Sequence, residues 1–507
     1  MGAALREAPF FVVLMAIGAA AMLIPAAHAL TLDDHRTARA FLYGAILMLG
    51  LTLLVALAVA GRRQRQRERG QLVTLLAAYT VLPAFFAVPF HEAAPASVSF
   101  AQAWFEMVSS ATTTGATLFD QPRFLASSLH LWRALVGWMG GLLIWVAAVA
   151  VLAPLNIGGF EVHQAVRHRG AGIRLSQIAR IADPSERLRR YAGALAPLYL
   201  ALTGVLWLGL TIAGEVPFVA LCHAMAILST SGISPVGGIA YSGAGFAGEL
   251  MIVLFLLLAL SRMTYSARLH SQTSRNLRRD PELRVGLFFI VALPAALFLR
   301  HWVLAEDGSF AQGFVAGLEA LWGGVFMVVS FLTTTGFESA YWMSASAWSG
   351  LSTPGLFLVG LSVIGGGVAT TAGGVKLLRV YALFKHGERE VERLVYPSSV
   401  GGAGAEARAI RRSGAQIAWI FFMLFAMSIA AVMVLLSLTG VQFETAMVLG
   451  TAALTTNGPL AQIAAEAPIS YAGLSGWSHL ILGAAMVLGR LETLALIALL
   501  NPGFWRR

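Results

Sequence analysis

The run Ala111-Thr112-Thr113-Thr114-Gly115 ends a short apolar stretch and is followed by a loop. Runs of the same kind return as Thr230-Ser231-Gly232, Thr334-Thr335-Gly336 and Thr456-Asn457-Gly458, with glycines 117, 104 and 122 residues apart. One such run would indicate only a helix cap or a turn. Four of them, each between two long apolar segments, predict a pseudo-fourfold ring. Backbone carbonyls in such a ring, with hydroxyl oxygens added by threonine, can replace the water around a dehydrated cation.

The composition indicates a polytopic membrane protein. Of the 507 residues, 58% are hydrophobic and 12% are charged, whereas soluble domains carry about 25% charged residues. The single cysteine, Cys222, excludes a disulfide framework within one chain and a cysteine-based metal site. The sequence has no zinc motif, Walker loop or dinucleotide fingerprint, so we expect no organic cofactor in this chain.

The net charge of +10 is distributed in a way that argues against a nucleic-acid partner. Basic residues concentrate at both termini and in alternate loops, at 62–69, 167–190, 262–284 and 376–412. By the positive-inside rule, these loops and both termini lie in the cytoplasm, and the chain is expected in the cell inner membrane. The opposite face is rich in acidic residues. That pattern favours an outer vestibule that concentrates cations, although loops that merely lack Lys and Arg would produce it too.

Apolar segments of about 20 residues are long enough to span a bilayer. Ten are expected, at 8–29, 40–60, 71–90, 130–153, 192–213, 246–265, 284–304, 353–384, 413–438 and 476–500. Stretches at 100–111, 217–229, 313–332 and 442–453 come just before the four threonine-rich runs. They are typical of re-entrant pore helices, since irregular backbone is tolerated at membrane depth only where protein or water surrounds it.

These segments predict an all-α polytopic membrane protein with ten transmembrane helices. Four pseudo-repeats of helix, re-entrant pore loop and helix are expected around a central pore, after an N-terminal helix pair at 1–66. The repeats are placed at 67–185, 186–280, 281–400 and 401–507, and the second helix of the third repeat is broken. Ala27-His28-Ala29 resembles a signal-peptidase site, but the apolar run before it is long, so we expect a retained helix.

A glycine-rich segment interrupts the eighth expected span. It reads Gly365-Gly366-Gly367-Val368-Ala369-Thr370-Thr371-Ala372-Gly373-Gly374-Val375-Lys376. So many glycines do not hold a regular helix, since each costs about 1 kcal/mol relative to alanine. The segment indicates either a kink for close helix packing or, as we favour, a movable loop below the ring. Thr370, Thr371 and Lys376 are its expected polar contacts.

Arg490 lies inside the last expected span, where a charged side chain costs at least about 2.5 kcal/mol. Pairing with Glu492 is one explanation, but residues i and i+2 do not share a helix face. We therefore expect Arg490 to line the path as a fixed positive charge. A rival motif, Gly473-Leu474-Ser475-Gly476 with His479 nearby, is similar to that of intramembrane serine proteases. A protease would leave the four runs unexplained, so this function is the remote alternative.

Over nearly the whole chain, these motifs resemble the TrkH, KtrB and HKT superfamily of K⁺ transporters, and TrkH most closely. The third run, Thr333-Thr334-Thr335-Gly336-Phe337, matches the family pattern well, and Gly489-Arg490-Leu491-Glu492 is similar to a TrkH run. The second run departs, with Ser231 where glycine is usual and Ile233 where an aromatic residue is usual. The fourth run keeps Asn, Gly and Pro but differs before them. The extra N-terminal helix pair is similar to TrkH rather than KtrB.

The resemblance implies that Gly115, Gly232, Gly336 and Gly458 are filter glycines and that K⁺ is the transported ion, with Rb⁺ accepted beside it. In the superfamily a serine at the first of these positions goes with Na⁺ preference, and here the residue is Gly115. The segment at 365–374 is by resemblance an intramembrane gate, with Arg490 as a barrier under the filter.

The resemblance further implies an assembly. It is a homodimer of pores on a cytoplasmic ring of TrkA-type nucleotide-binding subunits. Proton or Na⁺ symport is also attributed to the family, and the residues leave that choice open. A Na⁺-selective or Na⁺-coupled cation carrier is therefore the main alternative to K⁺ uptake through a channel-like filter. None of these activities is enzymatic.

Overall fold

The computed structural model describes residues 10–59, 68–155, 159–160, 184–261, 280–304, 310–351, 353–396 and 414–492. Within these ranges the chain consists of helices and loops and has no strand. Seven helical segments in the described ranges are long and apolar enough to cross a membrane. They are Phe10–Thr31, His35–Val59, Gly70–Ala93, Ser127–Leu155, Arg187–Ile212, Pro281–Arg300 and Ala415–Leu438. Each coincides with one of the ten expected spans.

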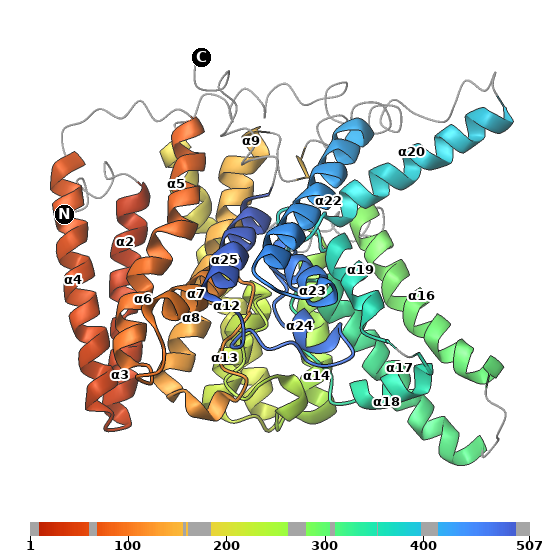
Figure 1. The fold of residues 1–507 in the computed structure, drawn as a ribbon, viewed down its shortest axis with the longest axis horizontal. Helices are drawn as coiled ribbons and strands as arrows, with labels where there is room; N and C mark the ends of the chain where they lie inside the picture. Colours follow the sequence, from red (N-terminus) through yellow and green to blue (C-terminus); the bar gives the residue numbers. More distant parts are fainter. Residues whose placement is uncertain are drawn as a thin grey trace.

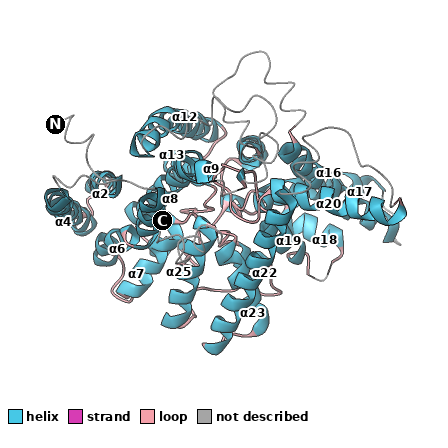
Figure 2. Ribbon diagram, turned by 90° about the horizontal axis from the view of Figure 1, so that it is seen from above, coloured by secondary structure: helices cyan, strands magenta, loops and turns pink. Residues whose placement is uncertain are grey.

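The helices that make up these segments are often joined end to end. In chain order they are α2 (Phe10–Ala21), α3 (Leu23–Thr31), α4 (His35–Val59), α5 (Glu68–Thr80), α6 (Leu82–Ala93), α8 (Ser127–Ala147), the π-helical turn η2 (Ala148–Leu152), α9 (Ala153–Leu155), α12 (Pro184–Ile212), α16 (Pro281–Leu304) and α22 (Ala415–Leu438). The N-terminal helices α2 and α4 lie at one edge of the molecule (Figures 1 and 2), where α4 packs on α6. This first part of the chain therefore stands outside the central arrangement.

The other three expected spans are shorter or interrupted. The segment at 246–265 forms α14 (Gly245–Leu256) and a 3₁₀ turn, η4 (Leu257–Leu260). The segment at 353–384 forms α19 (Leu356–Ile364) and then α20 (Leu377–Val395), which projects away from the bundle in Figure 1. The segment at 476–500 forms α25 (Gly476–Leu491), and residues beyond 492 lie outside the described ranges. The glycine-rich segment is a non-helical connection, so the interpretation as a mere kink is wrong.

Four helices lead into the threonine-rich runs: α7 (Phe100–Ala111), α13 (Pro217–Ser229), α17 (Phe310–Leu332) and α23 (Phe443–Leu454). Three have 12 or 13 residues, too few to span, whereas α17 has 23. Local sequence explains where two of them begin. Ser99 and Gln102 form a capping box at the start of α7, and Pro217 occupies the first turn of α13.

The four runs and their loops meet in the middle of the molecule, where helices surround a central group of loops (Figure 2). Shorter elements complete this loop layer: η1 (Pro122–Phe124), η3 (Ile239–Tyr241), α18 (Trp342–Ser349) and α24 (Leu460–Ile463). The core around it is apolar, with Trp132, Phe105 and Phe331 all fully buried. Irregular backbone in this position is covered by protein on its sides, which is the condition for tolerating it at membrane depth.

Candidate functional site

The four threonine-rich runs end their helices with the same backbone turn. One threonine in each run is left-handed: Thr113, Thr230, Thr334 and Thr456, with φ of 53°, 52°, 55° and 53°. The next residue donates its N–H to a carbonyl five residues back, in the pairs Thr114–Ser109, Ser231–Ala226, Thr335–Ser330 and Asn457–Ala452, at 2.8, 2.8, 2.9 and 2.8 Å. A positive φ is an outlier for a β-branched residue. Its return at four equivalent positions indicates a functional constraint.

Each run touches the next one in chain order, and the fourth touches the first. A Cβ added to any of the four glycines would overlap the neighbouring run: Gly115 the Ser231 carbonyl, Gly232 the Thr335 carbonyl, Gly336 the Asn457 amide oxygen, and Gly458 the backbone of Ala116. The Gly458 N–H also donates to the Thr114 carbonyl at 2.6 Å. The runs thus close a ring of residues 113–115, 230–232, 334–336 and 456–458, called the central ring below. All twelve candidate filter residues meet in it.

The side-chain oxygens of the central ring are unequally available. In three runs a ring hydroxyl is hydrogen-bonded to the hydroxyl of the residue two positions earlier. The pairs are Thr114–Thr112, Ser231–Ser229 and Thr335–Thr333, at 2.8, 3.0 and 3.0 Å. Asn457 occupies the corresponding position of the fourth run, and its amide donates to Ser362 on α19 at 2.8 Å. Within the described residues, Thr113 Oγ1, Thr456 Oγ1 and Asn457 Oδ1 are buried without a hydrogen-bond partner. These three oxygens are therefore not committed to a hydrogen bond within the described residues.

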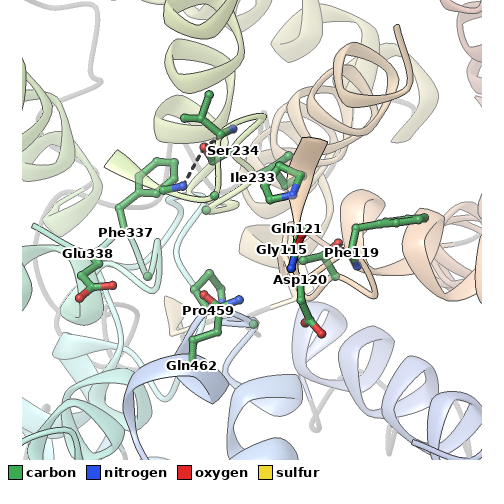
Figure 3. A pocket seen from close by; sticks show the side chains of 18 of the residues that line it. Gly115, Phe119, Asp120, Gln121, Ile233, Ser234, Phe337, Glu338, Pro459 and Gln462 are labelled. Carbon is green, nitrogen blue, oxygen red and sulfur yellow. Dashed lines mark hydrogen bonds between the residues drawn. The ribbon is translucent and has the colours of Figure 1, made fainter. Parts of the chain in front are cut away.

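One side of the central ring opens into a cavity of about 960 Å³, called the outer cavity. Its lining includes all four ring glycines, and Figure 3 shows Gly115, Ile233, Phe337 and Pro459 reaching it from four different loops. The charged residues of the lining are Asp120, Glu338, Arg123 and Arg133. Burial raises the pKa of the Glu338 carboxyl. The lining is thus a mixture of both signs rather than purely acidic.

The glycine-rich segment closes the other side of the central ring. The Gly373 N–H donates to Thr334 Oγ1 at 2.7 Å, and the Thr371 hydroxyl donates to the Leu228 carbonyl at 3.2 Å. A Cβ added to Gly373 would overlap the Thr455 carbonyl oxygen and the Thr456 hydroxyl. The segment therefore contacts the third and fourth runs directly and the end of α13, which leads into the second, and the cavity left beneath them is only about 20 Å³.

The backbone of this segment doubles back on itself. Gly365 and Gly374 both have positive φ, 72° and 76°. A Cβ added to either glycine would overlap the backbone at or next to the other. The loop is tied to its surroundings by the Val368 N–H, which donates to Glu282 Oε1 at 2.9 Å. Inside the loop, Lys376 Nζ donates to the Ala372 carbonyl. Only glycine permits the close approach at 365 and 374.

The Arg490 guanidinium lies against the same loop. Its Nη1 donates to the Thr371 carbonyl at 2.7 Å, the side chain is 4% exposed, and it lines the small inner cavity. Its Nε and Nη2 have no hydrogen-bond partner within the described residues. Glu492 pairs with Arg379 of α20 at 2.8 Å. Arg490 thus carries a charge at the inner side of the ring that Glu492 does not neutralise.

Comparisons with known proteins agree with this geometry. Residues 242–502 match the family model TrkH, described as a cation transport protein. The Trk system potassium uptake protein TrkH of Halomonas elongata is 30% identical over 473 residues, covering 92% of both chains. The chain belongs to the TrkH family. The TrkH of Escherichia coli K12 is 30% identical over 468 residues, 90% of this chain and 91% of that protein.

A solved structure supports the same assignment. The crystal structure of the potassium transporter TrkH from Vibrio parahaemolyticus aligns with a TM-score of 0.82 and 27% identity, over 98% of each chain. The TrkH family is a family of transporters, as the four runs predict, and not one of enzymes. Together with the apolar helices, membership makes the chain a multi-pass membrane protein.

The protease motif has a structural role instead. Ser475 is the N-cap of α25 and accepts the Ser478 N–H at 3.2 Å. His479 Nε2 lies 2.8 Å from the Tyr471 carbonyl oxygen, so it is engaged with a residue other than Ser475. In this TrkH-family chain, neither group is arranged as a nucleophile and its base.

The sequence motifs did not reveal the side chains that support the central ring. Ser362 accepts from Asn457, 95 residues away, and Glu106 holds the loop after Gly115 through Thr117 and Leu118. Arg133 pairs with Glu106. A charged residue inside the short apolar stretch 100–111 was the one available signal for Glu106. Charges at membrane depth mark functional positions in general, and the TrkH-family assignment alone does not single it out.

Proposed function

We propose that this chain takes up potassium across the cytoplasmic membrane by letting K⁺ pass through the central ring. The observation that carries the proposal is the closed circuit of contacts among the four runs, which turns four separate loops into one constriction. The relatives named above are Trk system potassium uptake proteins, and their alignments cover 92% and 90% of this chain. K⁺ is then cargo, dehydrated in the ring and rehydrated beyond it, with no bond made or broken.

The ring offers what K⁺ requires. Carbonyl oxygens replace its hydration shell, and glycine at 115, 232 and 336 allows the left-handed backbone that aligned carbonyls need. Gly115 at the first position favours K⁺ over Na⁺. An inward-negative membrane potential contributes about 2.3 kcal/mol per charge per 100 mV, which is enough to drive uptake without a coupled ion.

The described conformation corresponds to a closed gate. The loop at 365–374, including Gly366, Gly367 and Thr370, fills the space under the ring, and Arg490 places a positive charge there. A cation that leaves the ring would meet both. Opening therefore requires the loop to withdraw, and Arg490 loses its contact with Thr371 when it does.

The architecture we propose has ten transmembrane helices, the seven continuous ones plus those formed by α14, α19 with α20, and α25. Four pseudo-repeats at 67–185, 186–280, 281–400 and 401–507 follow the helix pair at 1–66. The identical turn at the end of four helices supports this division. The basic loops and both termini are placed in the cytoplasm, and the membrane is the inner membrane of the cell.

We place the chain in a homodimer that binds TrkA-type cytoplasmic nucleotide-binding subunits. Support for a protein partner comes from α20, whose exposed side includes Phe384, Val391 and Leu394, at 66%, 61% and 82% exposure. Such a stripe on a projecting helix is typical of an interaction surface. The helix starts directly after the gate, so a partner on α20 has a route to the loop.

Ion flux in liposomes tests the proposal. Purified protein is reconstituted, and uptake is measured under an inward K⁺ gradient, an inward Na⁺ gradient, and each gradient with the other ion present. K⁺ flux that is independent of Na⁺ and of a pH gradient supports the channel-like mechanism. Flux of Na⁺ alone, or K⁺ flux that requires Na⁺, would replace it with the Na⁺-selective or Na⁺-coupled carrier.

A further inference from the structure

A buried ion pair stands behind the first run of the central ring. Glu106 of α7 is 0% exposed, and its Oε1 accepts the Thr117 hydroxyl at 2.8 Å and the Leu118 N–H at 2.5 Å. Its Oε2 lies 2.8 Å from Nε of Arg133, which is 3% exposed and belongs to α8. The second contact is an ion pair by distance rather than an aligned hydrogen bond. One carboxylate thus joins two helices to the segment that follows Gly115.

That segment has little freedom left. Ser109 of α7 donates its hydroxyl to the Ala116 carbonyl at 2.7 Å, and Thr117 Oγ1 accepts the Phe119 N–H at 3.2 Å. Since Thr117 is two residues from Gly115, a shift of its anchor is passed to the Gly115 carbonyl. The position of that carbonyl relative to the ion decides how well the ring replaces water.

Stability alone does not explain an ion pair in this place. Burying two charges costs several kcal/mol per ion, and apolar replacements of similar volume are often as stable. Ionisable groups retained at membrane depth are functional by default. Glu106 and Arg133 also lie where function is sensitive, because Arg133 lines the outer cavity and carries a positive charge at its edge.

The other three runs are supported by different chemistry. Glu106 lies nine residues before Gly115, and Thr117 lies two residues after it. At the equivalent positions around Gly232 the residues are His223 and Ser234, which are hydrogen-bonded to each other at 2.8 Å. The third run is held by Glu249 of α14, which accepts the Ala340 N–H at 2.7 Å. In the fourth run the Tyr471 hydroxyl donates to the Gly458 carbonyl at 3.0 Å. Behind the second run, His223 Nδ1 also lies 3.9 Å from Glu215 Oε2, a wider contact that is ionic only when the imidazole is protonated. The arginine–carboxylate pair therefore distinguishes the first run from the others among the described residues.

We infer that Glu106 and Arg133 are a positioning pair that fixes the first run of the central ring and thereby sets the preference for K⁺ over Na⁺. Glu106 has a second effect, because it neutralises the Arg133 guanidinium at the edge of the outer cavity. Neither residue contacts the ion. As a statement about ion selection, the inference rests on the proposed function.

The test measures K⁺ and Na⁺ flux in liposomes for the full chain and for Glu106→Gln, Arg133→Gln and the double variant. Glu106→Gln removes the charge that strengthens the hydrogen bonds to Thr117 and Leu118, so we expect it to lower the K⁺/Na⁺ flux ratio about tenfold. Glu106→Gln should also lower the maximal K⁺ flux, because Arg133 is left uncompensated. The double variant should recover the maximal flux and not the ratio.

Two further variants keep the result decisive. Thr117→Val removes one anchor and leaves both charges in place, so it lowers the ratio even if Glu106→Gln fails to fold. Arg379→Gln is the matched control, since Arg379 is equally buried and paired with Glu492 at 2.8 Å on the inner side of the ring. Its effect is confined to the rate of flux, and the K⁺/Na⁺ flux ratio stays at the wild-type value.

The outcomes separate this inference from the proposed function. Unchanged K⁺/Na⁺ ratios in folded Glu106→Gln and Thr117→Val, with a selective wild-type protein, overturn the positioning role alone. A wild-type protein that carries no K⁺ overturns the proposed function itself.

Discussion

Gly373→Ala tests whether the loop at 365–374 holds the path closed. The added Cβ overlaps the Thr455 carbonyl oxygen and the Thr456 hydroxyl, and the loop must move away from the ring to relieve this. Moving away also breaks the hydrogen bond from the Gly373 N–H to Thr334 Oγ1. Overpacking costs about 1–3 kcal/mol, and the lost hydrogen bond about 1 kcal/mol.

The closed state is therefore destabilised by about 2–4 kcal/mol, a shift of roughly 30-fold to 1000-fold in the closed-to-open ratio. Since Gly373 does not have a positive φ, alanine adds no backbone strain of its own. The control is Gly360→Ala on α19, where a Cβ meets nothing within 4 Å. It should leave the flux unchanged.

The assay is K⁺ flux into liposomes that contain the purified chain without any cytoplasmic subunit. Gly373→Ala should raise this basal flux at least about 30-fold over wild type while the open state is rare. A folded, monodisperse variant with wild-type or lower basal flux would refute the idea that the loop is the gate.

Three other substitutions probe the remaining parts of the site. Gly115→Ser places a Cβ against the Ser231 carbonyl at a left-handed φ, a strain of about 1–2 kcal/mol; we expect weaker discrimination against Na⁺, and an unaltered K⁺/Na⁺ ratio would contradict the filter assignment. Arg490→Ala removes the fixed charge under the ring and should raise basal K⁺ flux; a lower flux in a folded variant speaks against a barrier. Ser475→Ala removes the cap of α25 and should cost about 1 kcal/mol of stability, seen as a lower melting temperature, with K⁺ flux intact. Loss of flux in a folded Ser475→Ala protein would reopen the enzymatic alternative.

The central ring could be predicted because its information is local and repeated. A threonine-rich run with glycine after a short apolar stretch is readable at each of four places, and the four runs are in contact in the structure. The glycine-rich segment could be located for the same reason. Continuous spans were predicted from length and hydropathy, whereas α17 is longer than a half-span because the apolar stretch at 313–332 is itself 20 residues long.

The supports of the ring could not be predicted, because they join residues far apart in the chain. Arg379 and Glu492 are separated by 113 residues, and Asn457 and Ser362 by 95. No periodicity relates such partners, because the two members of each pair belong to different elements: Ser362 lies on α19 and Arg379 on α20, whereas Asn457 and Glu492 follow α23 and α25.

The four walls of the ring are encoded at four separate places in one gene rather than by one sequence used four times. A substitution at Ser231 or Asn457 therefore alters a single wall and leaves the other three as they were. In a symmetric tetramer every change is multiplied fourfold, so small adjustments are hard to make. Here natural selection, or an experimenter, can change ion preference by substitutions in a single run of the central ring.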